Sequence, residues 1–399
     1  MRSAAPHDPP FDPASLIIDP HTAYDRLRDA GPVHRVPGTD GSPAWLVTRH
    51  DDVRRLLADP RLSLDKRNAA PGNYRGFALP PALDANLLNM DPPDHTRLRR
   101  LVTKAFTARR TEKLRGPVRR LAAELIDAIA PLGRADLIAS YAAPLPISVI
   151  CELLGIPPGD RADFRSWTDA LVTPDPARPE GAKQAVGEMS RFVAGLIARK
   201  RAHPADDLLS DLIATHDDGD RLSEDELTSL VFLILFAGYE NTVHLIGNAT
   251  LSLLDHPEQL RALRADPARL PAAVEELTRF DGPAPLAIRR FPVEEVEIGG
   301  TTIPAGETVL LSLASANRDP SRFPDPHNLD LSRTEVAHLA FGHGIHHCLG
   351  APLARLEATI ALSTLLHRLP GLALGVPREQ LTWRPTIRAR GLVSLPVTY

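Results

Sequence analysis

Apolar and polar residues repeat mostly with a helical period along this chain. Segments with apolar residues three and four positions apart predict amphipathic helices, and short β-branched runs bounded by turn residues predict strands. The expected helices are 21–30, 51–58, 94–106, 111–130, a set between 160 and 215, 223–255, 258–265, 271–281 and 351–367. The expected strands are 33–36, 45–48, 296–298, 309–313 and the C-terminal tail. Helix dominates, so the pattern predicts a mainly α fold with small β-sheets.

The longest helical pattern begins at Ser223 and meets no proline before Pro257. Ser223 and Glu226 form a capping-box pattern at its start, and a helix of this length spans about 48 Å. Such a helix must cross the core of a domain, and its centre, 230–237, is wholly apolar. Polar residues follow abruptly at Glu240.

One cysteine lies in a glycine-rich loop directly before the last helical pattern. The loop reads Phe-Gly-His-Gly-Ile-His-His-Cys-Leu-Gly from Phe341 to Gly350, with the thiol at Cys348. Gly342 and Gly344 permit backbone angles denied to other residues, so the chain can bend around a thiolate and turn amides toward its charge. Phe341 can cover the sulfur from water, and Gly350 lets the main chain approach a flat ring system.

The same loop raises the alternative of a zinc site. His343, His346, His347 and Cys348 lie close together, and all are possible zinc ligands. Structural zinc sites usually draw their ligands from two separated pairs. No second Cys/His pair follows downstream, which argues against zinc and leaves His343 and His347 as solvated or packed loop residues.

Two further polar pairs have helical spacing. Glu276 and Arg279 lie at i and i+3 on a predicted helix, which taken alone favours a surface ion pair. His95 and Arg99 lie at i and i+4 after a turn, with Asp94 as a candidate helix cap.

The spacing Phe-Gly-x-Gly-x-His-x-Cys-x-Gly strongly resembles the cysteine loop of the cytochrome P450 family, whose cysteine thiolate binds a haem iron. The resemblance implies haem b as the cofactor and Cys348 as the metal ligand. Glu276 and Arg279 resemble the family's Glu-x-x-Arg helix. Arg333 resembles the third member of a network that locks the cysteine loop against the core.

The resemblance extends from about Pro20 to the end of the chain. It implies a single triangular cytochrome P450 fold, mainly α with small β-sheets, as one haem-thiolate monooxygenase domain over 20–399. Residues 1–19 are expected to form an N-terminal tail.

By the same resemblance, several residues would surround the haem. Its propionates need charged or hydrogen-bonding partners when they are partly buried. The implied propionate partners are His95, Arg99, Arg290 and His346. The other implied cofactor-binding residues are Phe341, Gly342, Gly350, Ala237 and Gly238. Of these, the small residues of the long helix would leave room for dioxygen.

The segment from Ala237 to Thr242 resembles the family's Ala-Gly-x-Glu-Thr-Thr, which implies catalytic roles for Glu240, Asn241 and Thr242. Glu240 can carry protons. Asn241 stands where the family usually has a threonine that guides protonation, and Thr242 points about 100° away on an ideal helix. An amide both donates and accepts hydrogen bonds, so Asn241 could hold a water or a substrate group. A polar residue bonded to a helix carbonyl or to solvent is the alternative.

The composition indicates a soluble protein of a reducing cytoplasm. The N-terminal segment fits neither a signal peptide nor a membrane anchor, and the longest apolar run is far below the ~18 residues that span a bilayer. Two cysteines leave no disulfide framework, and Cys151 is expected to be a small buried side chain.

The net charge is only −4, but residues 95–120 hold ten Arg or Lys and one acid, Glu112. A nucleic-acid partner is disfavoured because no aromatic platform accompanies the charge. In the family that the chain resembles, this segment borders the face where acidic ferredoxins dock. The resemblance therefore implies ferredoxin and an NAD(P)H-dependent ferredoxin reductase as electron donors, and a solvated charged face is the alternative.

The resemblance implies a haem-thiolate monooxygenase that uses O2 and external electrons, since no dinucleotide-binding motif occurs in the chain. It would hydroxylate or epoxidise a medium-sized apolar natural product that is polyketide, terpenoid or peptide-derived. The pocket would draw on the loop 64–90, the long helix, 283–288 and a hairpin near 387–391. The alternatives are haem-thiolate chemistry without oxygen insertion, peroxide-driven or rearranging, and a non-catalytic interaction module.

Overall fold

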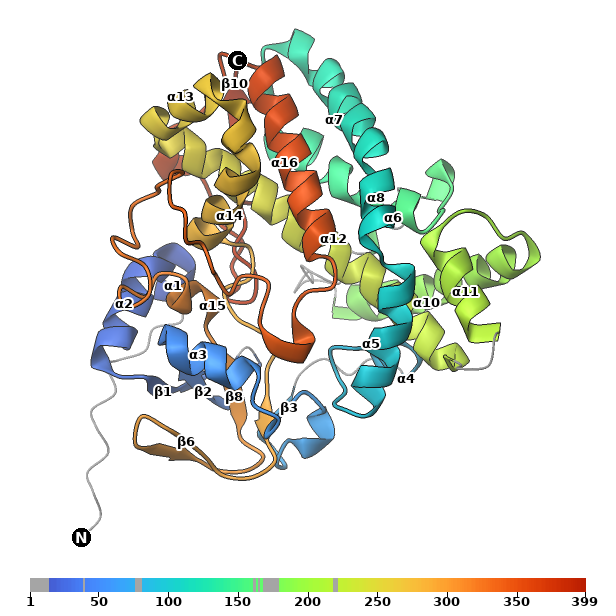
Figure 1. Ribbon diagram of the computed structural model, residues 1–399, viewed down its shortest axis with the longest axis vertical. Helices are drawn as coiled ribbons and strands as arrows, with labels where there is room; N and C mark the ends of the chain where they lie inside the picture. Colours follow the sequence, from blue (N-terminus) through green and yellow to red (C-terminus); the bar gives the residue numbers. More distant parts are fainter. Residues whose placement is uncertain are drawn as a thin grey trace. The chain divides into compact units, whose positions relative to one another are not determined.

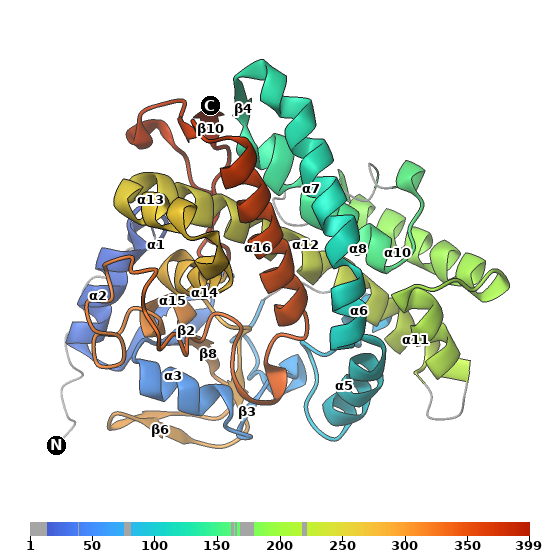
Figure 2. The ribbon, with the colours of Figure 1, turned by 45° about the horizontal axis from the view of Figure 1, so that its top comes forward.

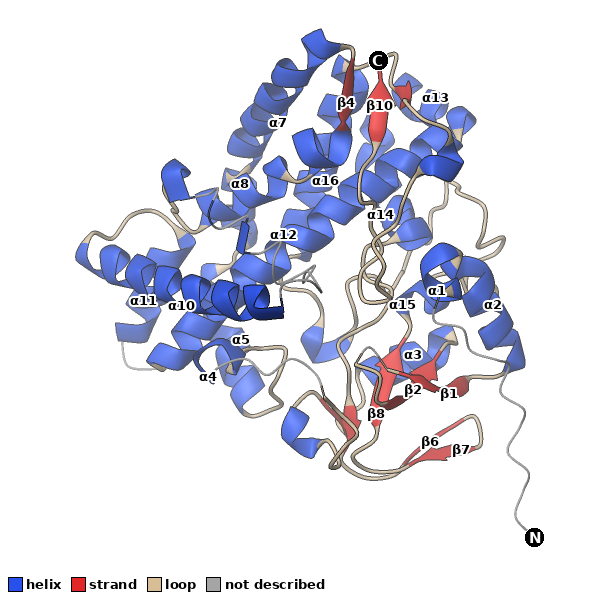
Figure 3. Cartoon of the chain, turned by 180° about the vertical axis from the view of Figure 1, so that it is seen from behind, coloured by secondary structure: helices blue, strands red, loops and turns tan. Residues whose placement is uncertain are grey.

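Helices dominate the computed structural model (Figures 1 and 3). It describes residues 14–38, 40–75, 81–160, 163, 166–167, 179–217 and 222–399. The α-helices are α1 Ser15–Ile18, α2 Pro20–Ala30, α3 His50–Leu57, α4 Pro81–Asp84, α5 Asp94–Ala105, α6 Ala108–Lys113, α7 Arg115–Ile129, α8 Pro144–Leu153, α10 Pro179–Ala202, α11 Leu208–Asp217, α12 Glu224–Asp255, α13 Pro257–Ala265, α14 Leu270–Asp281, α15 Leu313–Ala316 and α16 Ala351–Arg368.

Short strands form small sheets. The strands are β1 Val33–Pro37, β2 Pro43–Val47, β3 Leu62–Ser63, β4 Arg134–Asp136, β5 Phe291–Pro292, β6 Val296–Ile298, β7 Thr301–Ile303, β8 Thr308–Leu311, β9 Ala373–Leu374 and β10 Pro396–Thr398. Three-stranded sheets have the orders β1-β2-β8 and β4-β10-β9, and two-stranded sheets pair β3 with β5 and β6 with β7.

The chain divides into two units. The first unit is Met1–Phe77, Gly247–Cys348 and Pro377–Val393, and the second is Ala78–Ile246, Leu349–Val376 and Ser394–Tyr399. The boundary therefore falls within α12, and again directly after Cys348.

In the first unit, β2 is the central strand of its sheet. It pairs antiparallel with β1 and parallel with β8. Helix α3 lies beside this sheet (Figure 2), and its Val53 and Leu56 join Val47 and Val309 in one buried apolar cluster. The apolar residues of α3 lie on one side of the helix, and this side packs against the apolar face of the sheet.

In the second unit, α16 packs along α7, and the two helices run side by side in Figures 1 and 2. The buried residues of α7 recur every three or four positions, at Val118, Ala122, Ile126 and Ile129. Tyr141, in the π-helical turn Ile138–Ala142, donates a hydrogen bond to the Ala361 carbonyl of α16 at 2.8 Å. The strip of apolar residues and this hydrogen bond place α16, the helix that follows the cysteine loop.

Most predicted helices and strands on described residues are confirmed, with differences at their ends. Of the set expected between 160 and 215, α10 and α11 are confirmed, whereas 161–162, 164–165 and 168–178 lie outside the described residues. Helix α8 is absent from the predicted helices. The expected helix 111–130 is two helices, α6 and α7, joined at Leu114. The prediction of Asp94 as a cap is wrong, because Asp94 is the first residue of α5 and Pro93 precedes it. In the strand-like run 283–288, Leu286 forms an isolated bridge with Ser312 and no strand is assigned among these described residues.

Helix α12 is long and apolar enough to cross a membrane by length and composition alone. In this structure most of its apolar part is buried, and the core helix of a soluble protein passes the same test. Of the expected tail 1–19, residues 1–13 lie outside the described part of the chain, and α1 occupies most of the remainder. The single domain over 20–399 stays a prediction.

Candidate functional site

The thiol of Cys348 is exposed at the end of a tightly turned loop in the first unit. The Cys348 amide donates a hydrogen bond to the Phe341 carbonyl at 2.8 Å, and the Gly342 amide donates to the Leu339 carbonyl at 2.8 Å. Gly342 and Gly344 have φ of 75° and 73°, values that other L-residues rarely adopt. The two glycines therefore allow the loop to fold back on itself and present the sulfur.

A buried ionic network leads to the base of this loop. The Arg279 guanidinium donates to the two Glu276 oxygens at 2.7 and 2.8 Å, and Arg333 Nε lies 3.3 Å from Glu276 Oε2. Arg279 also donates to the Asn317 carbonyl at 2.9 Å, and the Asn317 side chain accepts the Leu339 amide at 2.7 Å. The predicted contact of Glu276, Arg279 and Arg333 is confirmed. Hydrogen bonds through Asn317 connect it to Leu339, two residues before the cysteine loop begins.

Two of the four predicted propionate partners lie in the first unit. Arg290 is buried, exchanges backbone hydrogen bonds with Val309 at 2.8 and 2.9 Å, and donates from Nη1 to the Leu62 carbonyl at 3.3 Å. His346 lies in the helical turn Gly344–His346 of the cysteine loop and is partly exposed. The backbone pairing fixes the position of Arg290, whereas the position of His346 is set by the loop that carries Cys348.

The other two predicted propionate partners, His95 and Arg99, lie one turn apart on α5 in the second unit. His95 is 1% exposed, and burial together with the charge of Arg99 lowers its pKa to about 4. The imidazole is therefore neutral near pH 7 and keeps one N–H donor. A neutral donor beside a permanent cation suits a carboxylate ligand.

Helix α12 has an uncovered strip in its centre. Ala237 and Asn241 are exposed and lie four residues apart, whereas Tyr239 and Thr242 between and beside them are buried. Residues four apart share one face of a helix, so Ala237 and Asn241 lie on the same uncovered strip.

Two glycines predicted to contact the cofactor are partly exposed. They are Gly238 on α12 and Gly350, which begins the turn into α16.

Gly238 lies where α12 approaches α8. A Cβ on Gly238 would stand 2.5 Å from Cδ1 of Ile150, so glycine permits a close approach of the two helices. The Thr242 hydroxyl donates back to the Gly238 carbonyl at 3.5 Å and is buried. Thr242 therefore faces away from the uncovered strip, as the ideal helical spacing from Asn241 predicts.

The family model of cytochrome P450 matches residues 182–371. The chain is 52% identical to the cytochrome P450 monooxygenase PikC of Streptomyces venezuelae, over 96% of this chain and 92% of that protein. The chain belongs to the cytochrome P450 family. It is also 44% identical to the mycinamicin IV hydroxylase/epoxidase of Micromonospora griseorubida, over 100% of both chains.

Solved P450 structures share the fold of this chain. The cytochrome P450 PksS of the bacillaene polyketide synthase of Bacillus subtilis 168 matches with a TM-score of 0.91 and 40% identity, over 97% of this chain and 99% of that one. The predicted mainly α P450 fold with small β-sheets is confirmed. This P450 is a monooxygenase and an oxidoreductase, its cofactor is haem, and its family uses dioxygen and electrons from redox partners.

The residues of this P450 fit a haem group. A haem iron needs one protein ligand and its carboxylates need donors, and the chain offers an exposed thiol at Cys348 and a neutral buried imidazole beside Arg99. The uncovered strip at Ala237 and Asn241 leaves a face of α12 open to a flat ligand. No group of three or more His, Cys, Asp or Glu that could hold a bare metal ion occurs among the described residues, so the zinc alternative finds no support there.

His244 is a polar partner that was absent from the residues predicted from the sequence. Its Nε2 lies 3.3 Å from Oε1 of Glu240 on the same helix, and its side chain is fully buried. Glu240 itself is half-buried. The i, i+4 spacing of the two residues on a predicted helix is the signal that could have found this pair.

Ion pairs already neutralise part of the basic stretch 97–120. The pairs are Arg97 with Glu226, Arg110 with Asp211, Lys113 with Asp206 and Arg115 with Glu112. Exposed basic side chains remain at Lys104, Arg109, Arg119 and Arg120. The positive surface is therefore narrower than the sequence count indicates.

Proposed function

We propose that Cys348 is the thiolate ligand of the haem iron. The observation that carries this proposal is the exposed thiol at the end of a loop whose base is held by the buried Glu276–Arg279 pair. A thiolate-ligated haem supplies the chemistry that cleaves dioxygen, because the sulfur pushes electron density toward the iron. The chain itself must hold the sulfur in place and keep the group bound.

The propionates are assigned to a buried or partly buried set of donors, namely His95, Arg99, Arg290 and His346. Charge-assisted hydrogen bonds stabilise carboxylates more than neutral ones do, and two of these donors are permanent cations. The ring contacts are assigned to Phe341, Gly342, Gly350, Ala237 and Gly238. Support comes from the small size or partial exposure of these positions.

Glu240, Asn241 and Thr242 are proposed as the catalytic group on α12. Glu240 carries protons toward the uncovered strip, because its carboxylate is half-buried and hydrogen-bonded to the His244 ring. The exposed Asn241 amide holds a water or a polar group of the substrate. Thr242 faces away from that strip, and its proposed part is to support the helix through its hydrogen bond to the Gly238 carbonyl.

The proposed reaction is hydroxylation or epoxidation of a medium-sized apolar natural product, polyketide, terpenoid or peptide-derived, and the polyketide class is favoured. Support comes from the relatives, since one is named a mycinamicin IV hydroxylase/epoxidase and another belongs to a polyketide synthase. The pocket is proposed to draw on α12, 283–288, 387–391 and the loop 64–90. Residues 76–80 of that loop lie outside the described part of the chain.

The proposed electron donors are a ferredoxin and its NAD(P)H-dependent reductase. Support comes from the exposed basic residues Lys104, Arg109, Arg119 and Arg120, which suit an acidic partner. We further propose a cytoplasmic location and one functional domain over 20–399.

The test of the haem ligand is the variant Cys348→Ser. The wild-type protein should give the red-shifted band of the reduced carbon monoxide complex, and Cys348→Ser should lose it because a hydroxyl does not supply the thiolate. Cys151→Ser is the matched control, since Cys151 is the other cysteine of the chain and is buried in α8. Persistence of the band in Cys348→Ser would refute the assignment.

A second candidate function is haem-thiolate chemistry without oxygen insertion, either peroxide-driven or rearranging. The observation that favours it is the exposed amide of Asn241, where a hydroxyl is usual in the family. Product formed with peroxide alone, but not with ferredoxin, reductase and NAD(P)H, would favour this candidate. Product with neither system would favour a non-catalytic P450-like module.

A further inference from the structure

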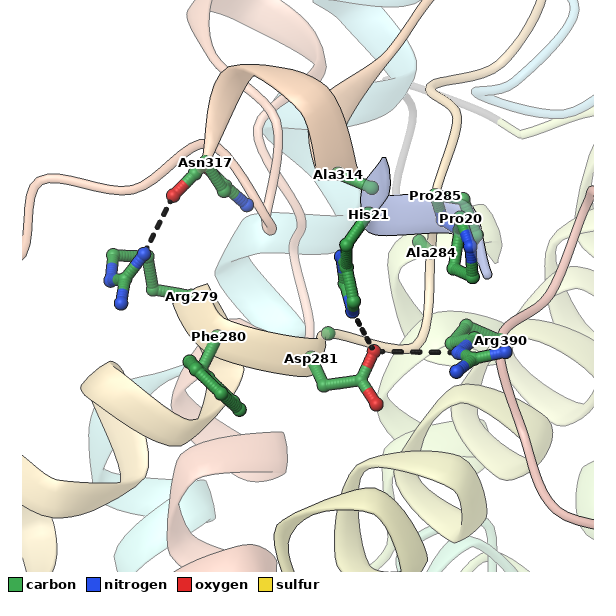
Figure 4. A pocket seen from close by; sticks show the side chains of 11 residues that line it. Pro20, His21, Arg279, Phe280, Asp281, Ala284, Pro285, Ala314, Asn317 and Arg390 are labelled. Atoms are coloured by element: carbon green, nitrogen blue, oxygen red, sulfur yellow. Dashed lines mark hydrogen bonds and ion pairs between the residues drawn. The ribbon is translucent and has the colours of Figure 1, made fainter. Parts of the chain in front are cut away.

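Asp281 ends α14 in the first unit and forms the centre of a charged cluster (Figure 4). Its Oδ1 lies 3.5 Å from Nε2 of His21 on α2 and 3.5 Å from Nε of Arg390. Burial alone would raise the pKa of Asp281, but the charge of Arg390 and the hydrogen bond of His21 outweigh it and hold the pKa at about 2. The carboxylate is therefore ionised at neutral pH.

Arg390 is held through both its backbone and its side chain. Its amide donates to the Pro283 carbonyl at 2.8 Å, and its carbonyl accepts a hydrogen bond from Asn248 Nδ2 at 2.9 Å. Its Nη1 donates to the Ile17 carbonyl at 3.0 Å. The guanidinium lies over the Trp383 ring, with Cζ 3.2 Å from the ring centroid. One residue thus joins four segments of the first unit.

These contacts connect two segments assigned to the substrate pocket. Arg390 belongs to the hairpin 383–392, which is closed by the bridge between Trp383 and Leu392. Pro283 begins the segment 283–288. Leu286 from that segment and Ile387 from the hairpin pack against the same buried apolar cluster. The two segments are therefore held together by polar contacts at Arg390 and by a shared apolar base.

We propose that the ion pair of Arg390 and Asp281 is a positioning device that sets the shape of the substrate pocket. The ion pair fixes the hairpin 383–392 against the segment 283–288. Asn248 of α12 holds the same hairpin through its hydrogen bond to the Arg390 carbonyl. The inference rests on the pocket proposed above and deepens it by naming the residues that determine which compounds fit.

The surroundings of the pair favour a fixed geometry. The cavity beside it measures about 10 Å³, room for about one water, so solvent screens the charges little. Arg318, another nearby cation, stacks on the Phe280 ring at 4.0 Å and donates to the Phe280 carbonyl at 2.8 Å. Charge attraction is stronger in such a site than at the surface, and removal of one partner leaves the other charge buried. A neutral residue in place of Arg390 should therefore displace the hairpin.

The test measures the binding of two azoles to the haem-loaded protein by the shift of the Soret band. Imidazole is small, whereas clotrimazole is bulky and samples the shape of the pocket. The variants are Arg390→Met, Asp281→Asn and their combination, with Arg390→Lys as the conservative change. Arg378→Met is the matched control, because it removes the exposed partner of Asp255, at 2.8 Å, from the same C-terminal segment.

Arg390→Met and Asp281→Asn should bind imidazole like the wild type and change the ratio of the clotrimazole to the imidazole dissociation constant by about tenfold. The double variant should show no more than the larger single effect, because both changes break one interaction. Arg390→Lys should restore most of the ratio, and Arg378→Met should not alter it.

An unchanged ratio in haem-loaded Arg390→Met would overturn the inference. If Arg390→Met does not fold, Asp281→Asn and Arg390→Lys decide by the same ratio. A wild-type protein that loads haem but lacks the red-shifted band of the reduced carbon monoxide complex would overturn the proposed haem site itself, which is a different outcome from an unchanged ratio.

Discussion

At the scale of single residues, the pairing of Glu240 with His244 gives α12 a polar contact directed away from solvent. The His244 ring is fully buried, and Nε2 lies 3.3 Å from the Glu240 carboxylate. A carboxylate held by an imidazole on one side can keep its other oxygen for a water or a substrate group. His244 is therefore a positioning residue for Glu240. The adjacent Asn241 is exposed, and its amide can hold a water that exchanges protons with Glu240.

If Glu240 carries protons, Glu240→Ala should slow product formation by about 10²-fold and leave carbon monoxide binding unchanged. Asn241→Thr restores the hydroxyl that is usual in the family. Weaker substrate binding in Asn241→Thr, measured by the Soret shift, would mean that the amide recognises the substrate, and this is the expected result. Better coupling of NAD(P)H to product would mean that the amide limits protonation.

His244→Gln is the matched change for the positioning role. Glutamine can still donate to Glu240, so the variant should retain more turnover than His244→Leu at equal haem content. A double variant with Glu240→Ala and Asn241→Ala that forms product at the wild-type rate, with NAD(P)H fully coupled to product, would exclude a proton relay through these residues.

At the scale of secondary-structure elements, α16 carries an ionisable side chain on its buried face. Glu357 is 1% exposed, and its Oε2 has no hydrogen-bond partner among the residues that the structure describes. Burial raises the pKa of Glu357 well above its usual value of 4.5. A folded-state pKa above the unfolded one means that the folded state binds more protons, so this group lowers stability as pH rises from the unfolded toward the folded pKa.

Glu357→Met should therefore stabilise the protein by about 1–3 kcal/mol, because it removes a buried polar group without a partner. The gain in melting temperature over wild type should be larger at about pH 8 than at about pH 5. Glu357→Gln does not titrate, so its difference from Glu357→Met should be independent of pH. An equal gain at both pH values would show that Glu357 does not titrate in this range.

Elements with local signals were predictable, whereas those that depend on distant contacts were not. The start of α12 follows from Ser223 and Glu226, whose reciprocal hydrogen bonds measure 2.8 and 3.1 Å. The helix α8 is almost entirely buried, so its sequence lacks the polar face that marks an amphipathic helix. The cysteine loop has a local motif, but the contact of Asp281 with Arg390 joins residues far apart in the chain, and each alone reads as a surface charge.

At the scale of the whole chain, a small net charge hides an uneven distribution. The net charge is −4, yet ten of the 46 Arg and Lys residues lie in 95–120, with a single acid among them. Acidic residues of the same unit neutralise several of them, as Asp211 does for Arg110. Reversal of Arg110 would therefore break an internal ion pair as well as alter the surface. Lys104 and Arg109 are the better probes, because both are exposed.

Lys104→Glu combined with Arg109→Glu should slow reduction by ferredoxin by about tenfold at low salt, since charges at the rim of an interface mainly set the association rate. The loss should shrink as salt rises, because ions screen exposed charges. Reduction by dithionite should stay at the wild-type rate, since it needs no docked protein. Arg26→Glu combined with Arg54→Glu, two exposed charge reversals on α2 and α3, makes the same change of −4 in net charge and is the control. Equal ferredoxin rates for the double variant and the wild type across salt concentrations would place the docking surface elsewhere.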